Sequence, residues 1–228
     1  SLKDLPTAPV PGLRLWAYPK REDPRDAWIG KDGLGFKDLR AGHRVATGAL
    51  RREAQLRHAV PGLQILPIRG NVDTRLAKFD AGEFDGLLLA AAGLRRLGLE
   101  NRVTEYLEPT QWLPAPGQGI LAVEGPDDPG TRELLSPLNH APSRSAAMAE
   151  RAFLATLEAG CHVPVGALAL VDGERLHLRG LMASVDGARV MRGEAQTTIA
   201  AASKAGQSLA ERLLHDGGEA LRAGWNRA

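Results

Sequence analysis

The chain has 228 residues, of which 43% are hydrophobic and 25% charged, and a formal net charge of +2, which is ordinary for a globular protein of one or two domains. It contains no apolar run long enough to span a membrane and begins without the apolar core of a signal peptide, so we expect a cytoplasmic protein with no membrane partner. Aromatic residues make up only 4% and there is no lysine-rich stripe, which argues against binding to nucleic acid.

The first half of the chain alternates predicted strands and helices. A proline-rich start leads into a strand that ends near Tyr18, and a charged connector follows over residues 20–26. Hydrophobic spacing then predicts a helix over 50–58, a strand over 63–68, a helix over 71–81, a buried strand over 84–92 and a short basic helix over 94–98. This rhythm is typical of an α/β fold, in which a parallel or mixed sheet carries helices on both faces.

The second half predicts a smaller α+β region. A rigid turn of proline and glycine over 114–119 precedes a strand over 120–123, and an amphipathic helix is predicted over 143–157. Two Asp-Gly turns then separate three short strands, and the chain ends with another amphipathic helix. The predicted ranges are 165–171, 176–183 and 189–192 for the strands and about 200–214 for the helix.

Cys161 is the only cysteine in the chain, and it lies in a segment flanked by Gly160 and Pro164. One cysteine cannot form an internal disulfide and is too few for a zinc site. Three interpretations remain for this thiol: an inert buried side chain, which is the commonest case, an exposed reactive group, or a point of covalent attachment.

Arginines dominate the region between Arg40 and Arg102, which contains eleven basic and six acidic residues. A codon preference explains part of this excess but not the positions of the arginines. They begin helices or follow strands, and ligands of open α/β sheets bind at the carboxyl ends of strands. We therefore expect one cleft that holds a ligand with several carboxylates or phosphates. The arginines concerned are Arg51, Arg52, Arg69, Arg75, Arg95 and Arg96.

Asp4 follows Lys3 near the start of the chain. A carboxylate beside an arginine-lined cleft stays ionised, because positive charge nearby lowers its pKa. Such a group can stabilise a developing cation or shuttle a proton. A surface Lys-Asp pair without such a role is the commoner occurrence.

Seven segments in order along the chain resemble the porphobilinogen deaminase (hydroxymethylbilane synthase) family. They match the catalytic aspartate motif, the first hinge, three anion-binding segments, the return to the first domain and the cofactor-attachment loop of that family. The segments are Ser1–Pro6, Arg21–Asp26, Leu50–Arg52, Arg69–Arg75, Ala90–Gly98, Leu113–Gly119 and Glu158–Gly166.

The resemblance implies a transferase of porphyrin biosynthesis that acts on porphobilinogen. In this family a dipyrromethane cofactor is attached to cysteine, here Cys161, through a thioether. Four porphobilinogen units are then joined head to tail with loss of ammonia, and water releases hydroxymethylbilane. Because every unit carries an acetate and a propionate, the growing chain is a polyanion, which explains the arginines.

The resemblance also implies roles for individual residues. Asp4 would be the catalytic group, a buried carboxylate that stabilises the cation left when ammonia departs. The cofactor would contact Lys3, Thr47, Arg51, Arg52 and Arg75. The substrate would contact Arg69, Arg75, Arg96 and Gln118.

Three domains and a monomeric protein follow from the same resemblance. We expect residues 1–20 and 118–138 to belong to an incomplete first domain, 24–113 to a second, arginine-rich domain, and 142–228 to a third domain that carries Cys161. The first two would resemble the lobes of periplasmic anion-binding proteins. A non-catalytic anion-binding protein of that two-lobed type is the alternative.

The chain departs from the family pattern in two places. Gly48 and Ala49 stand where the family usually has two serines, so hydroxyl donors are missing at the start of the predicted helix over 50–58. The family also has about 70–80 residues before the segment that matches Ser1–Pro6, within the usual range of domain sizes. We therefore expect these 228 residues alone to be inactive.

Overall fold

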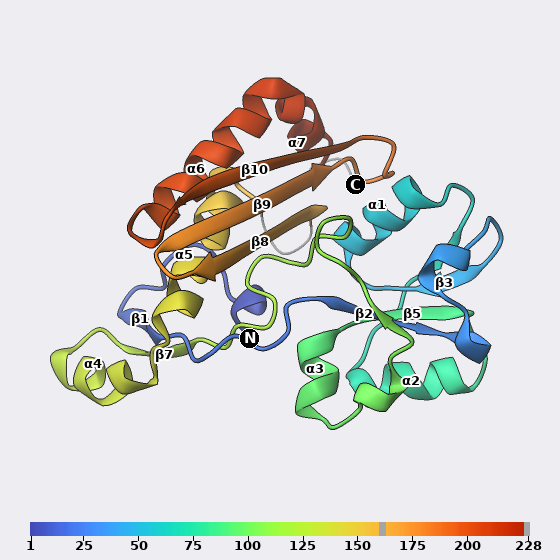
Figure 1. Ribbon diagram of the computed structural model, residues 1–228, viewed down its shortest axis with the longest axis horizontal. Coiled ribbons are helices and arrows are strands. Elements are labelled where there is room, and N and C mark those ends of the chain that lie inside the picture. Colours follow the sequence, from blue (N-terminus) through green and yellow to red (C-terminus); the bar gives the residue numbers. More distant parts are fainter. Residues whose placement is uncertain (160–162, 226–228) are drawn as a thin grey trace.

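The computed structural model describes residues 1–159 and 163–225 and has a mixed α/β architecture (Figure 1). Within these residues the strands form a five-stranded sheet, a two-stranded sheet and a three-stranded sheet. No helix in this part of the chain is both long and apolar enough to cross a membrane. The mixed α/β class predicted from the sequence is confirmed.

The five-stranded sheet is mixed, with the strand order β4-β3-β5-β2-β6. Strand β3 runs parallel to β4 and β5, whereas β2 runs antiparallel to β5 and β6. The sequence did not reveal β2, whose first residue, Asp26, was assigned to a charged connector. The strands are β2 (Asp26–Gly30), β3 (Arg44–Ala46), β4 (Gln64–Leu66), β5 (Gly86–Ala90) and β6 (Glu105–Tyr106).

Helices cover both faces of this sheet because its central strands are apolar on both sides. On β5, Leu87 and Leu89 belong to one core and Leu88 to another. The first core also contains residues of α2 (Val72–Asp80) and α3 (Ala91–Arg96), and the second contains Leu56 of α1 (Leu50–Ala59). Because Ala91 begins α3, strand β5 is shorter than the predicted strand over 84–92.

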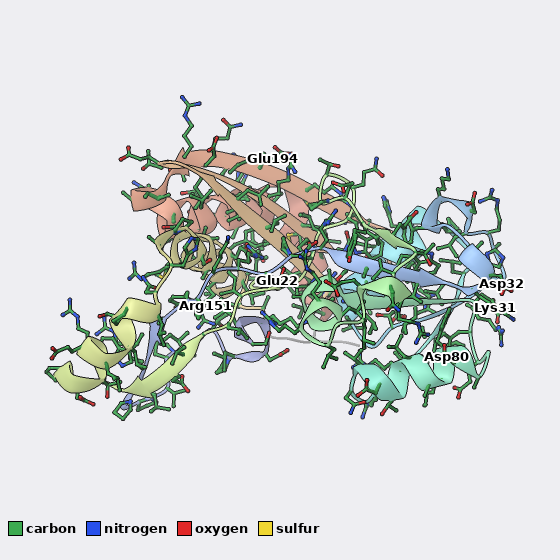
Figure 2. All side chains as sticks on the ribbon, turned by 60° about the horizontal axis from the view of Figure 1, so that its bottom comes forward. Glu22, Lys31, Asp32, Asp80, Arg151 and Glu194 are labelled. Atoms are coloured by element: carbon green, nitrogen blue, oxygen red, sulfur yellow. The ribbon has the colours of Figure 1, made fainter. Side chains whose placement is uncertain are left out.

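The two-stranded sheet pairs β1 (Leu13–Ala17) with β7 (Val123–Pro126), and α4 (Pro129–Leu135) packs against it. The predicted strand over 120–123 is wrong, because the strand begins only at Val123. The preceding turn contains Gly119 at a φ of 83°, where a Cβ would lie 2.4 Å from the carbonyl oxygen of Glu22. Glu22 and Gly119 belong to the two connectors between the two-stranded and five-stranded sheets, residues 18–25 and 107–122, which approach each other closely here. Figure 2 shows Glu22 near the middle of the molecule, whereas Lys31, Asp32 and Asp80 lie at the outer end of the five-stranded region.

The three-stranded sheet is an antiparallel meander of β8 (Val165–Asp172), β9 (Arg175–Ala183) and β10 (Val190–Thr198). Helices α5 (Ala141–Thr156) and α6 (Ala202–Leu213) lie behind it in Figure 1, and α7 (Glu219–Trp225) follows. Strand β10 is longer than the predicted range 189–192. It is an edge strand on which partly buried and exposed residues alternate, so its apolar signal is weak.

The remaining regular structure consists of short turns. These are the 3-10 turns η1 (Leu2–Asp4), η2 (Lys31–Gly33), η3 (Phe36–Asp38), η4 (Glu100–Arg102), η5 (Ser136–Leu138) and η6 (Ile199–Ala201), and a π turn, η7 (Leu214–Gly218).

Candidate active site

Four of the predicted arginines line one cavity of about 310 Å³. Its walls come from η1, the start of α1, the loop between β4 and α2, and α2 itself. The lining residues are Lys3, Asp4, Gly48, Ala49, Arg51, Arg52, Ile68, Arg69, Gly70, Arg75 and Ala115. We call this space the arginine cavity.

The sheet topology explains this convergence. Helix α1 follows β3 and the loop with Arg69 follows β4, and these two strands are parallel neighbours. Their carboxyl ends therefore lie at the same edge of the sheet, as in other ligand sites of α/β folds. The predicted convergence is confirmed for Arg51, Arg52, Arg69 and Arg75.

Two other predicted arginines do not line the cavity. Arg95 lies 3.3 Å from Glu22 and 3.8 Å from Asp23 in ion pairs. Arg96 donates a hydrogen bond of 3.1 Å to the carbonyl oxygen of Gly119, at the crossing of the connectors. The assignment of Arg96 to the substrate remains a prediction.

Asp26 lies beneath the cavity and binds the side chains of Arg51 and Arg52. It is fully buried, and its two carboxylate oxygens accept six hydrogen bonds, three each. The donors are Nη1 and Nη2 of Arg51 at 2.7 and 3.0 Å, Nε and Nη2 of Arg52 at 3.1 and 2.7 Å, Nε1 of Trp112 at 2.7 Å, and Nε2 of Gln118 at 2.8 Å. We call this group the Asp26 cluster.

The charges in the Asp26 cluster are unequal. Burial would raise the pKa of Asp26, but the adjacent guanidinium groups of Arg51 and Arg52 outweigh it and hold that pKa well below the usual value. Burial lowers the pKa of Arg51, which Asp26 partly offsets. One carboxylate thus faces two guanidinium groups, so the cavity wall keeps a net positive charge.

Lys3 and Arg75 add to this positive potential. Burial and the charges of Arg52 and Arg51 lower the pKa of Lys3 to about 8. Burial and the charge of Arg52 also lower the pKa of Arg75, whose Nε donates a 2.8 Å hydrogen bond to the carbonyl oxygen of Gly70. Cations that disfavour one another in this way gain stability when an anion binds between them.

Asp4, Thr47 and Gln118 differ in their surroundings. Asp4 lines the cavity but is exposed, so the expectation of a buried carboxylate is wrong for this structure. Thr47 is buried, and its Oγ1 accepts a 3.2 Å hydrogen bond from the amide of Ala49. Gln118 is fully buried, and its Oε1 accepts a bond of 3.1 Å from Arg51.

Cys161 lies outside the described residues. Val163, two positions later, lines a smaller pocket of about 80 Å³ together with Leu154 and Val165. That pocket shares four lining residues with the arginine cavity: Lys3, Ala49, Arg51 and Ala115. Val163 therefore lines a pocket that adjoins the arginine cavity.

This geometry defines an α/β protein with an arginine-lined cavity at the carboxyl edge of a mixed sheet. Residues 1–132 match the family model described as porphobilinogen deaminase, dipyromethane cofactor binding domain, and residues 145–215 match the model of the porphobilinogen deaminase C-terminal domain. The chain belongs to the porphobilinogen deaminase family.

Curated relatives named porphobilinogen deaminase support this assignment over nearly the whole chain. The relative from Roseiflexus castenholzii is 48% identical over 98% of this chain and 74% of its own length. The Nocardia farcinica relative is 50% identical over 97% of this chain and 67% of its own length, and the Thermus thermophilus relative is 47% identical over 98% and 75%. The predicted family, the transferase function and the dipyrromethane cofactor are thereby confirmed.

The arginine cavity suits a cofactor with several carboxylates. The Nε of Arg51 is buried and has no hydrogen-bond partner among the described residues, so an anionic oxygen there would satisfy it. Ala49 is the N-cap residue of α1 and provides no side-chain cap, so a ligand could bind the amides of the first turn. A Cβ at Gly48 would lie 2.5 Å from the carbonyl oxygen of Ile68, so this structure has no room for a serine there.

Sequence reasoning missed Asp26 as a site residue. The segment Arg21–Asp26 has the sequence of a charged connector or hinge, and a run of charges is usually solvated. The available signal was the apolar sequence that follows, Ala27-Trp28-Ile29, which marks the beginning of a buried strand.

Proposed function

We propose that the arginine cavity holds the carboxylates of cofactor and substrate while four porphobilinogen units are joined head to tail with loss of ammonia. One observation carries the proposal. Guanidinium groups from α1, the loop after β4 and α2 line one space, together with Lys3 and Asp4. Acetate and propionate groups on every pyrrole unit need such a set of donors.

The residues divide into three roles. Arg52, Arg69 and Arg75 bind carboxylates of the growing chain, and Arg51 and Lys3 supply further positive charge. Asp4 stabilises the positive charge that develops on the substrate as ammonia leaves. Its exposure supports a role at the open side of the cavity, where closure around the substrate would remove water.

Thr47 and Gln118 act indirectly in this proposal. The Thr47 hydroxyl orients the start of α1 through the amide of Ala49, and Gln118 links Arg51 to Asp26. Arg96 links α3 to the connector that contains Gly119 through its hydrogen bond to that residue. It would contact the substrate only after this connector has moved. The dipyrromethane, attached to the sulfur of Cys161, would supply the carbon to which the first unit is joined.

We further propose three domains, with residues 1–20 and 118–138 in the first, 24–113 in the second and 142–228 in the third. The separate sheets of the three regions support this division. The first two would form lobes like those of periplasmic anion-binding proteins, with the cavity between them. A monomeric, cytoplasmic enzyme without nucleic-acid or membrane partners fits this proposal.

Intact-mass spectrometry of the denatured protein tests the proposal. We expect a mass higher than that of the polypeptide by two pyrrole units, absent in Cys161→Ser and reduced in occupancy in Arg75→Gln. A protein that binds porphobilinogen but carries no added mass in the wild type would instead support the non-catalytic anion-binding alternative.

A further inference from the structure

The Asp26 cluster restricts what its two arginines can still bind. Asp26 begins β2, and its backbone is held on both sides, because it pairs with Ala90 of β5 and its carbonyl oxygen accepts a 2.9 Å bond from the amide of Leu107. The carboxylate is therefore fixed by the sheet itself. Any guanidinium group bound to it is fixed as well.

The N–H groups of Arg51 are almost fully used. Nη1 donates to Asp26 Oδ2 and to the carbonyl oxygen of Leu113 at 3.2 Å, and Nη2 donates to Asp26 Oδ1 and to Gln118 Oε1 at 3.1 Å. These bonds occupy all four terminal N–H groups. Only the buried Nε–H has no partner among the described residues.

Arg52 is used differently. Its Nε and Nη2 donate to Asp26, and its Nη1 donates to the carbonyl oxygen of Leu88 at 2.9 Å. Since each terminal nitrogen carries two N–H groups, one on Nη1 and one on Nη2 remain unused by the described residues. A pair of N–H groups from two nitrogens is what a bidentate grip on a carboxylate requires.

We propose that Asp26 is a positioning residue that gives the two adjacent arginines different roles. Arg52 binds a ligand carboxylate through two N–H groups, whereas Arg51 stabilises the cavity wall and has only its Nε–H left for a ligand. The proposal rests on the function proposed above for the arginine cavity. It extends that function by giving different roles to Arg51 and Arg52, which are adjacent and identical in the sequence.

The matched variants Arg51→Lys and Arg52→Lys test the division of tasks, because both keep the charge and lose the guanidinium group. Isothermal titration with a porphobilinogen analogue that lacks the amino group, and so cannot lose ammonia, measures the dissociation constant, and thermal denaturation measures stability. We expect Arg52→Lys to weaken binding about tenfold more than Arg51→Lys, the size expected for a charge-assisted hydrogen bond. Equal losses in the two variants would overturn the proposal.

Asp26→Asn tests the positioning role, because it keeps the shape of the side chain and removes its charge. We expect binding to weaken about tenfold or more, since charge-assisted bonds to both arginines are lost. In ¹⁵N–¹H spectra, the side-chain signals of Arg52 and the indole signal of Trp112 should move. Unchanged binding together with unchanged Arg52 signals would refute this role.

Two sets of variants serve as controls. If Asp26→Asn does not fold, the Arg51→Lys and Arg52→Lys pair still decides, because both variants retain Asp26. Arg75→Gln separates this proposal from the function proposed for the cavity, since Arg75 lines the same space but binds Gly70 instead of Asp26. If Arg75→Gln and Arg69→Gln leave binding intact, the cavity itself is wrongly assigned. If they weaken it while Asp26→Asn and Arg52→Lys do not, only the present inference fails.

Discussion

Arg21 in the first connector and Glu150 on α5 form a buried ion pair, with 2.6 Å between Nη1 and Oε1. The Arg21 side chain is 11% exposed and that of Glu150 is not exposed at all. Glu150 also accepts bonds from the amide of Gly117 at 2.6 Å and of Ala169 at 2.7 Å. One carboxylate thus joins both connectors to the C-terminal region.

Glu150→Gln should therefore destabilise the protein strongly. The variant leaves the guanidinium group of Arg21 buried without a counter-charge, which typically costs about 3–5 kcal/mol. Urea denaturation gives the free energy of unfolding. Glu219→Gln is the control, because Glu219 pairs with Arg222 at the surface and its loss should change stability by less than about 1 kcal/mol. Equal effects of the two variants would contradict this expectation.

Lys3 should make anion binding depend on pH near 8. Its pKa is lowered to about 8, so it is charged below that pH and loses its charge as the pH rises through it. The affinity for porphobilinogen should therefore fall between about pH 7 and 9. In Lys3→Arg the side chain stays charged over this range, and the fall should flatten. A pH profile that is the same in both proteins would show that Lys3 does not contribute.

Restoring the two serines that the family usually has should give opposite results. Gly48→Ser places a Cβ 2.5 Å from the carbonyl oxygen of Ile68, a backbone atom, so we expect a loss of about 1–3 kcal/mol from overpacking. Ala49→Ser adds a side-chain cap to α1, where Ala49 has extended backbone angles and no cap, and should stabilise by about 0.5–2 kcal/mol. Thermal denaturation of both variants checks the signs. Stabilisation by Gly48→Ser would contradict this expectation, because it would show that the backbone at Ile68 can move away from the new side chain at little cost.

Gly206 on α6 should be intolerant of a side chain. A Cβ there would lie 2.1 Å from the carbonyl oxygen of Ala149 on α5, where the two helices cross closely. Gly206→Ala should therefore cost about 1–3 kcal/mol in the free energy of unfolding, although alanine favours helix. Gly224→Ala in α7 meets no atom within 4 Å and serves as the control, with an expected gain of up to about 1 kcal/mol. A gain in both variants would contradict the close packing of α5 and α6.

The arrangement of elements was largely predictable from the sequence, because hydrophobic spacing is a local property. Helices α1, α2 and α5 lie close to their predicted ranges, and β8 and β9 follow the pattern expected around their Asp-Gly turn. The positions of Arg51, Arg69 and Arg75 at helix starts and strand ends predicted a common cavity. That step needed only the rule that parallel strands end at the same edge of a sheet.

Only the tertiary structure decided which charges pair. Asp26 binds Arg51, 25 positions away, and Trp112, 86 positions away, and no local pattern records such distances. The free energy of a buried carboxylate depends on the donors that surround it after folding, whereas a sequence shows only a charged connector. For the same reason the exposure of Asp4 and the different surroundings of Arg51 and Arg52 became visible only once the sheet, its helices and the connectors were assembled.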